Sequence, residues 1–148
     1  MNTPRPPAMT QPSESYGFYC TLADMRFPEA IARVTDALKV EGFGVLTDID
    51  IQATVKAKLS IDMPAYRILG ACNPPLAQRA LTAQPDIELL LPCNVIVREE
   101  AHGGQTVEFM DPVAVMQMTD APEVAQVATE VRARLERVRA ALAAPTPT

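Results

Sequence analysis

The stretch YRILGACNPPLA, residues 66–77, predicts a buried strand that passes directly into a helix. The apolar part, Tyr66 to Ala71, is typical of a strand covered by other elements. The two prolines that follow suit the opening of a helix through about Leu81, because the first turn makes no use of the N–H groups that proline lacks. A thiol and an amide, those of Cys72 and Asn73, therefore stand where the strand breaks.

A second stretch, LLLPCNV at residues 89–95, repeats the theme of an apolar run, a proline and a Cys-Asn pair. It predicts a long strand over residues 88–99. Pro92 must then sit at a sheet edge or a bulge, because it cannot donate a hydrogen bond to a neighbouring strand. Gly103-Gly104 turns the chain into a further strand over residues 106–110, so these two strands form an antiparallel hairpin with a longer loop.

The N-terminal half alternates strands with helices. Strands are predicted over residues 16–23 and 43–49, the latter with its odd-numbered side chains on one face. A helix over residues 27–41 lies between them and ends at Gly42, since glycine most easily adopts the left-handed conformation that closes a helix. Asp50 is predicted to cap a short helix that follows.

The last helix has the clearest pattern. Asp120 is its expected N-cap, and a short helical turn over residues 113–118 precedes it. Apolar residues then recur at spacings of three and four, a stripe typical of a helix on a sheet or on a second copy of itself. They are Val124, Val127, Val131, Leu135, Val138 and Leu142. The whole pattern predicts a two-layer α+β fold: a mixed or mostly antiparallel sheet of about five strands, with helices packed on one face.

Length and composition limit the possible classes of protein. The 148 residues fit one domain, which we place at residues 16–142, between a flexible lead-in at 1–15 and a flexible tail at 143–148. The net charge of -5 disfavours a nucleic-acid partner. No apolar run approaches the roughly 20 residues of a membrane span, and the N-terminus lacks the apolar block of a secretory signal. Together with three cysteines, too few for a disulfide scaffold, this predicts a cytoplasmic protein with reduced thiols and no membrane partner.

Two opposite interpretations of the cysteines remain open. Cys72 precedes a predicted helix N-terminus, where the helix dipole would favour a reactive thiolate. A free cysteine is also among the most commonly buried residues, and the alternative is that Cys72 is a small apolar core residue. Cys93 could approach Cys72 if their strands are neighbours, but a disulfide requires Cα atoms within about 7 Å. Cys20, inside the first strand, is expected in the core.

The remaining polar residues define no complete catalytic set. Asn73 and Asn94 either cap a break in a strand or hold a polar ligand beside Cys72. The single histidine, His102, lies in the predicted hairpin loop, so neither a catalytic triad nor a metal site is expected. Phosphate-binding and dinucleotide-binding glycine motifs are missing from the sequence, and we expect no cofactor.

Four motifs occur in order along the chain: EGFGVLT at residues 41–47, YRILGACNP at 66–74, LLPCNV at 90–95 and MDP at 110–112. Together they resemble a bacterial and archaeal family described only as domain of unknown function 302. The resemblance covers about Tyr16 to Leu142. It implies a compact α+β fold, often a homodimer, and no established reaction. The family pattern includes the Cys-Asn-Pro and Leu-Pro-Cys stretches that contain Cys72 and Cys93 here.

Three hypotheses follow. The first is a non-catalytic homodimer that binds a small ligand or partner near Cys72, Asn73, Pro92, Cys93 and Asn94, with the last helix or an uncovered sheet edge as the dimer contact. The second is a thiol-based redox or sulfur-transfer enzyme, with Cys72 as nucleophile and Cys93 as resolving thiol. The third is a purely structural or scaffolding protein, which predicts no pocket at either cysteine.

Overall fold

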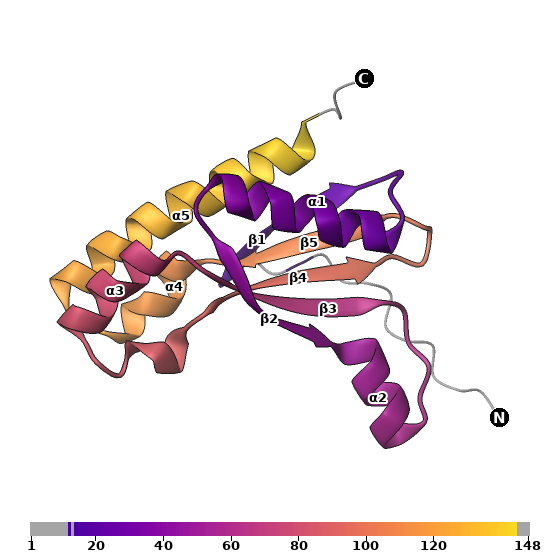
Figure 1. Ribbon diagram of the computed structural model, residues 1–148, viewed down its shortest axis with the longest axis horizontal. Helices are drawn as coiled ribbons and strands as arrows, with labels where there is room; N and C mark the ends of the chain where they lie inside the picture. Colours follow the sequence, from indigo (N-terminus) through magenta and orange to yellow (C-terminus); the bar gives the residue numbers. More distant parts are fainter. Residues whose placement is uncertain (1–11, 13, 145–148) are drawn as a thin grey trace.

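The structure is a computed structural model that describes residue 12 and residues 14–144 (Figure 1). The predicted flexible ends lie largely outside these residues, so that prediction stays untested. The strands are β1 (Gly17–Leu22), β2 (Gly44–Asp50), β3 (Tyr66–Cys72), β4 (Cys93–Glu99) and β5 (Gln105–Met110). The α-helices are α1 (Phe27–Val40), α2 (Ile51–Leu59), α3 (Pro74–Ala83), α4 (Pro112–Val115) and α5 (Pro122–Ala143). Two short 3₁₀ helices, η1 (Ile87–Leu90) and η2 (Met116–Met118), complete the order.

The strands form one antiparallel sheet in the order β1-β5-β4-β3-β2. The register sets Leu69 opposite Val95, and Val95 opposite Phe109. Because directly opposed residues share a face, these three side chains line one side of the sheet, and all three are buried. The predicted α+β fold with five strands is therefore confirmed, and the sheet is wholly antiparallel.

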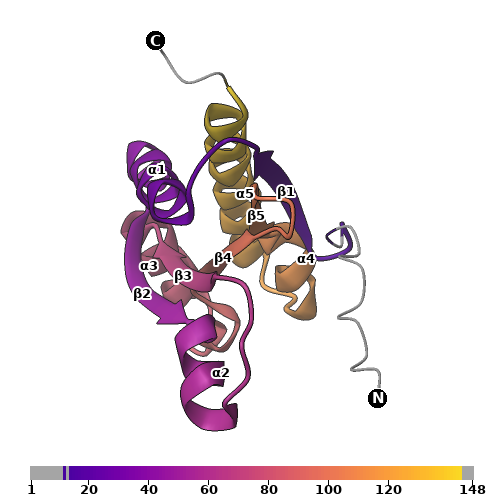
Figure 2. The ribbon, with the colours of Figure 1, turned by 90° about the vertical axis from the view of Figure 1, so that its right-hand side faces the viewer.

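Helices α1 and α5 lie side by side over that apolar face (Figures 1 and 2). Helices α3 and α4 pack against α5 near one end of the sheet, whereas α2 projects from the opposite end. The apolar stripe predicted for α5 is buried in the chain's own core, with Leu135 and Val138 at 0% exposure. The stripe consequently faces the sheet and is not available to a second copy.

The predicted strand over residues 88–99 was wrong in its first half. Residues 87–90 form η1, the Leu91–Pro92 peptide bond is cis, and β4 begins only at Cys93. A run of leucines is compatible with strand or helix, and proline cannot supply the N–H that strand pairing needs. The predicted long strand is therefore a helical turn, a proline break and a shorter strand.

Two smaller predictions also need correction. In β2 a register shift separates Val45, which pairs with Ala71, from Thr47, which pairs with Gly70. This bulge moves the later odd-numbered side chains to the other face of the sheet. In α5 the N-cap is Ala121, with no side-chain cap, and not Asp120. The predicted cap at Asp50 is confirmed, because its carboxylate accepts a hydrogen bond from Ala53 N at 2.8 Å.

Candidate functional site

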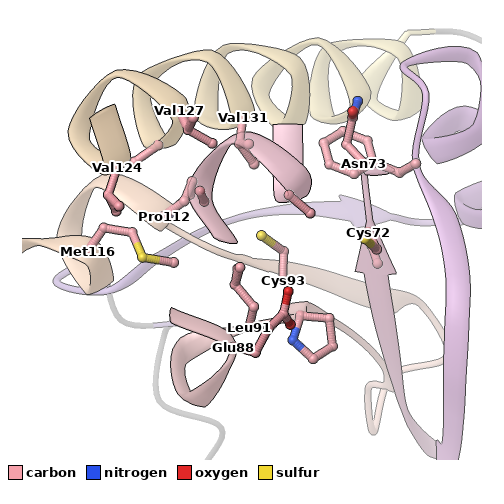
Figure 3. A pocket seen from close by; sticks show the side chains of 16 residues that line it. Cys72, Asn73, Glu88, Leu91, Cys93, Pro112, Met116, Val124, Val127 and Val131 are labelled. Carbon is pink, nitrogen blue, oxygen red and sulfur yellow. The ribbon is translucent and has the colours of Figure 1, made fainter. Parts of the chain in front are cut away.

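A pocket opens where β3 ends and β4 begins, between the sheet and helices α3, α4 and α5 (Figure 3). The enclosed cavity has a volume of about 40 Å³. It widens into an open mouth, and the atom-free space that includes this mouth is about 490 Å³. One wall is an apolar strip of α5, formed by Val124, Val127, Ala128 and Val131. Apolar walls and a few polar groups at the rim are the usual composition of a small-molecule site.

Cys93 lies at the base of this pocket. It is 4% exposed and stands opposite Ala71 on the apolar face of the sheet. Burial raises the pKa of its thiol to about 12, and the nearby Cys72 and Glu88 add to the increase. A thiol in this state is almost entirely protonated at neutral pH and behaves as a small apolar group.

Cys72 also lines the pocket, at the end of β3. Because neighbouring residues of a strand point to opposite faces, its side chain starts from the face opposite to Ala71 and Cys93. Figure 3 shows the Cys93 sulfur directed into the pocket and away from Cys72. Both thiols are free, and desolvation, with a smaller contribution from Glu88, raises the pKa of Cys72 as well. The segments do meet at one pocket, but this arrangement favours neither a disulfide nor a thiolate.

Asn73 has a structural role. Its side chain caps α3 by accepting a hydrogen bond from Leu76 N at 3.4 Å, and its amide donates to the Glu41 carbonyl at 3.3 Å. The same carbonyl accepts from the Arg134 guanidinium at 3.1 Å. Asn73 thus joins the start of α3 to the end of α1 and, through Glu41, to α5.

Gly42 makes this junction possible. It has φ +86°, and a Cβ added there would lie 2.9 Å from the Asn73 amide nitrogen. Two hydrogen bonds, from Gly42 N to the Lys39 carbonyl and from Phe43 N to the Leu38 carbonyl, close α1 in a Schellman motif. The EGFG and CNP motifs, far apart in sequence, are therefore two halves of one contact.

The other two predicted site residues have different positions. Pro92 lines the pocket, and its ring would contact a side chain at Gly70. Asn94 pairs with Gly70 and is exposed, outside the residues that line the pocket. The structure thus brings Cys72, Asn73, Pro92 and Cys93 together and leaves Asn94 aside.

Sequence reasoning missed Glu88. It lies in η1, lines the pocket, and contributes through its charge to the raised pKa of both Cys72 and Cys93. Figure 3 shows it on the opposite side of the pocket from Val127 and Val131. Assigning residues 88–99 to a strand hid this position. The Pro85-Asp86 turn signal just before it could have indicated the helical turn.

Other site types find no support in the described part of the chain. No three His, Cys, Asp or Glu side chains among residues 12 and 14–144 are grouped so that they could hold a metal ion. His102 lines a separate depression beside the β4–β5 loop. Over the same residues, no helix combines the length and hydrophobicity needed to cross a bilayer.

Comparisons with known proteins agree with this architecture. The profile of the family described as "Domain of unknown function DUF302" matches residues 18–142. The crystal structure of an uncharacterized conserved DUF302 protein from Bacillus stearothermophilus is similar, with 25% identity and a TM-score of 0.77. The match covers 84% of this chain and 96% of that one. No curated protein matches the chain. The chain belongs to the DUF302 family.

Proposed function

We propose that this chain is a non-catalytic domain that binds a small apolar ligand in the pocket at Cys72, Asn73, Pro92 and Cys93. The observation that carries the proposal is the composition of the pocket: apolar side chains from sheet and helices, around a buried thiol that is protonated at neutral pH. Burial of an apolar ligand would gain roughly 25 cal/mol for each Å² removed from water. The pocket also weighs against the purely structural hypothesis.

The alternative of a thiol enzyme has less support. A nucleophilic cysteine needs a lowered pKa or a neighbouring base, whereas the pKa values of Cys72 and Cys93 are both raised. Asn73 is already engaged in the contact between α1 and α3. These features suit a binding cavity better than a reaction centre.

The test is to fill the pocket from within. Ala77 is a half-buried α3 residue that lines the pocket, whereas Ala83, on the same helix, is exposed and lies outside it. Titration of the wild-type protein with n-hexanol should shift the methyl NMR signals of Val127 and Val131. We expect Ala77→Phe to abolish these shifts and Ala83→Phe to retain them. Equal shifts in both variants, or none in the wild type at saturation, would refute the pocket as a binding site.

We propose further that the chain forms a homodimer through the outer edge of β2 and helix α2. The edge presents Leu46 and Ile49, which are 66% and 45% exposed, and Leu59 at the end of α2 is 63% exposed. Helix α2 has nine residues and none of them is buried. A helix this short is marginal in water without packing, so a covering partner would explain its stability.

Sedimentation equilibrium tests the dimer separately from ligand binding. The wild-type chain should be dimeric at micromolar concentration, and Leu46→Lys should be monomeric, because a charge at an edge strand opposes pairing. Leu89→Lys is the matched control, since Leu89 is 86% exposed but lies in η1. A monomeric wild type would remove the dimer from the proposal and leave the pocket unaffected.

A further inference from the structure

The pocket has an asymmetric distribution of charge. Among its described lining residues, Glu88 alone is charged, and none is a lysine, arginine or histidine. The deeper walls are apolar side chains, including the buried Phe43 and Met116, and the protonated thiol of Cys93. The site thus offers one negative charge and otherwise only neutral surface.

Among the described residues Glu88 has no cationic partner, unlike three other carboxylates near the pocket. Glu123 and Glu130 both pair with Arg79, at 2.9 and 2.5 Å. Asp111, which caps α4, lies 3.4 Å from Arg132. Within the described part of the chain, no hydrogen bond or ion pair engages the Glu88 carboxylate.

From these observations we infer that the ligand is a small apolar amine, whose hydrocarbon end enters the cavity from its open mouth and whose ammonium group stays at the rim beside Glu88. This inference rests on the proposed binding function. Glu88 is exposed. An ammonium group bound beside it would therefore keep part of its hydration and avoid the high cost of burying an ion.

The same geometry disfavours an anionic ligand. A carboxylate bound at the rim would bring a second negative charge near Glu88, with no cation among the described lining residues to compensate it. The effect of Glu88 reaches the interior, since its charge helps to raise the pKa of both Cys72 and Cys93. A neutral ligand would avoid the repulsion but would gain nothing from the carboxylate.

Three probes with the same six-carbon chain length and different charges test the inference at pH 7 and low salt: n-hexylamine, n-hexanol and hexanoate. Methyl NMR titration of the full chain gives each Kd. Hexylamine should bind about fivefold more tightly than hexanol. This factor is the upper limit of what an ion pair contributes in a solvent-exposed setting. Hexanoate should bind most weakly. The advantage of the amine should shrink as salt is added, because exposed charges are screened.

Two charge-neutralising variants locate the effect. Glu88→Gln keeps the shape of the side chain and should bring the Kd values of amine and alcohol together. Asp86→Asn removes one negative charge two residues away, at a position outside the pocket lining, and should leave the preference intact.

The outcomes separate the inference from the proposed function. Binding of all three probes that is abolished by Ala77→Phe supports the apolar binding function. If hexylamine then binds no more tightly than hexanol, or keeps its advantage in Glu88→Gln, the inference fails and the apolar binding function stands. A preference for hexanoate would also overturn the inference. If none of the three probes binds, the inference and the proposed function fail together.

Discussion

Substitution of Gly42 by alanine tests the junction that holds one rim of the pocket. An L-residue at φ +86° costs about 1–2 kcal/mol, partly offset by about 0.4–1 kcal/mol from the stiffer unfolded chain. The new Cβ would lie 2.9 Å from the Asn73 amide nitrogen, so Asn73 must move and lose the hydrogen bond to Glu41, worth about 1 kcal/mol. Weakening the α3 cap costs about another 1 kcal/mol. We therefore expect Gly42→Ala to lower the free energy of unfolding by about 2–3.6 kcal/mol.

Urea denaturation measures this change, and two other glycines provide matched controls. Gly103 has φ +101°, but no described residue lies within 4 Å of an added Cβ, so Gly103→Ala should show only the backbone cost of about 1 kcal/mol. Gly44 does not have a positive φ, and an added Cβ there would have no neighbour within 4 Å in the part of the chain that the structure describes. Gly44→Ala should therefore be close to neutral. If Gly42→Ala destabilised the protein no more than Gly103→Ala, the contact with Asn73 would carry no energy and the reasoning would be refuted.

Three further predictions concern the core, the pocket and the sheet. Leu135→Ala should lower the free energy of unfolding in urea by about 2–5 kcal/mol, because this side chain is 0% exposed. Leu89→Ala, at 86% exposure, should change it by no more than about 0.5 kcal/mol. Equal effects would contradict the assigned core. Iodoacetamide should barely label Cys93 in the native protein at pH 8, because a pKa raised to about 12 leaves almost no thiolate. Labelling at the rate of an unfolded control would count against a buried thiol. The hydrogen bond from Arg67 lowers the pKa of Asp48 below its usual 3.8. The stabilisation by this ion pair is therefore fully present above the pKa of Asp48 in the unfolded chain. It is lost as the pH falls through the lower pKa of Asp48 in the folded chain. Asp48→Asn should flatten the pH dependence of stability in that acidic range, and an unchanged slope would argue against the pair.

Elements with strong local signals were predictable from sequence. The α5 stripe, the Gly42 terminus of α1 and the Asp50 cap depend on residues close together in the chain, so periodicity and capping chemistry suffice to find them. The segment around Pro92 was not predictable in the same way. An apolar run fits a strand or a helical turn equally well, and the choice was made by packing with the rest of the fold.

In the candidate site, too, some features could be predicted from local sequence and others depend on the fold. The strand breaks at Cys72 and Cys93 could each be identified from sequence because both combine an apolar run with polar residues and proline, whereas their meeting at one pocket depends on the pairing of β3 with β4. The exposure of Asn94 depends on strand register, which a sequence does not display. The role of Asn73 depends on its contact with Glu41, 32 residues away. Glu88 entered the site only because residues 87–90 form a helical turn and not a strand.

The most direct test of the binding site is a set of intermolecular NOEs between n-hexylamine and the wild-type protein. We predict contacts from the terminal methyl of the amine to Val131 and to the Cys93 methylene, and contacts from the carbon beside the ammonium to Glu88. NOEs only to the uncovered face of the sheet, or none at a saturating amine concentration, would contradict the assignment of this pocket as the binding site.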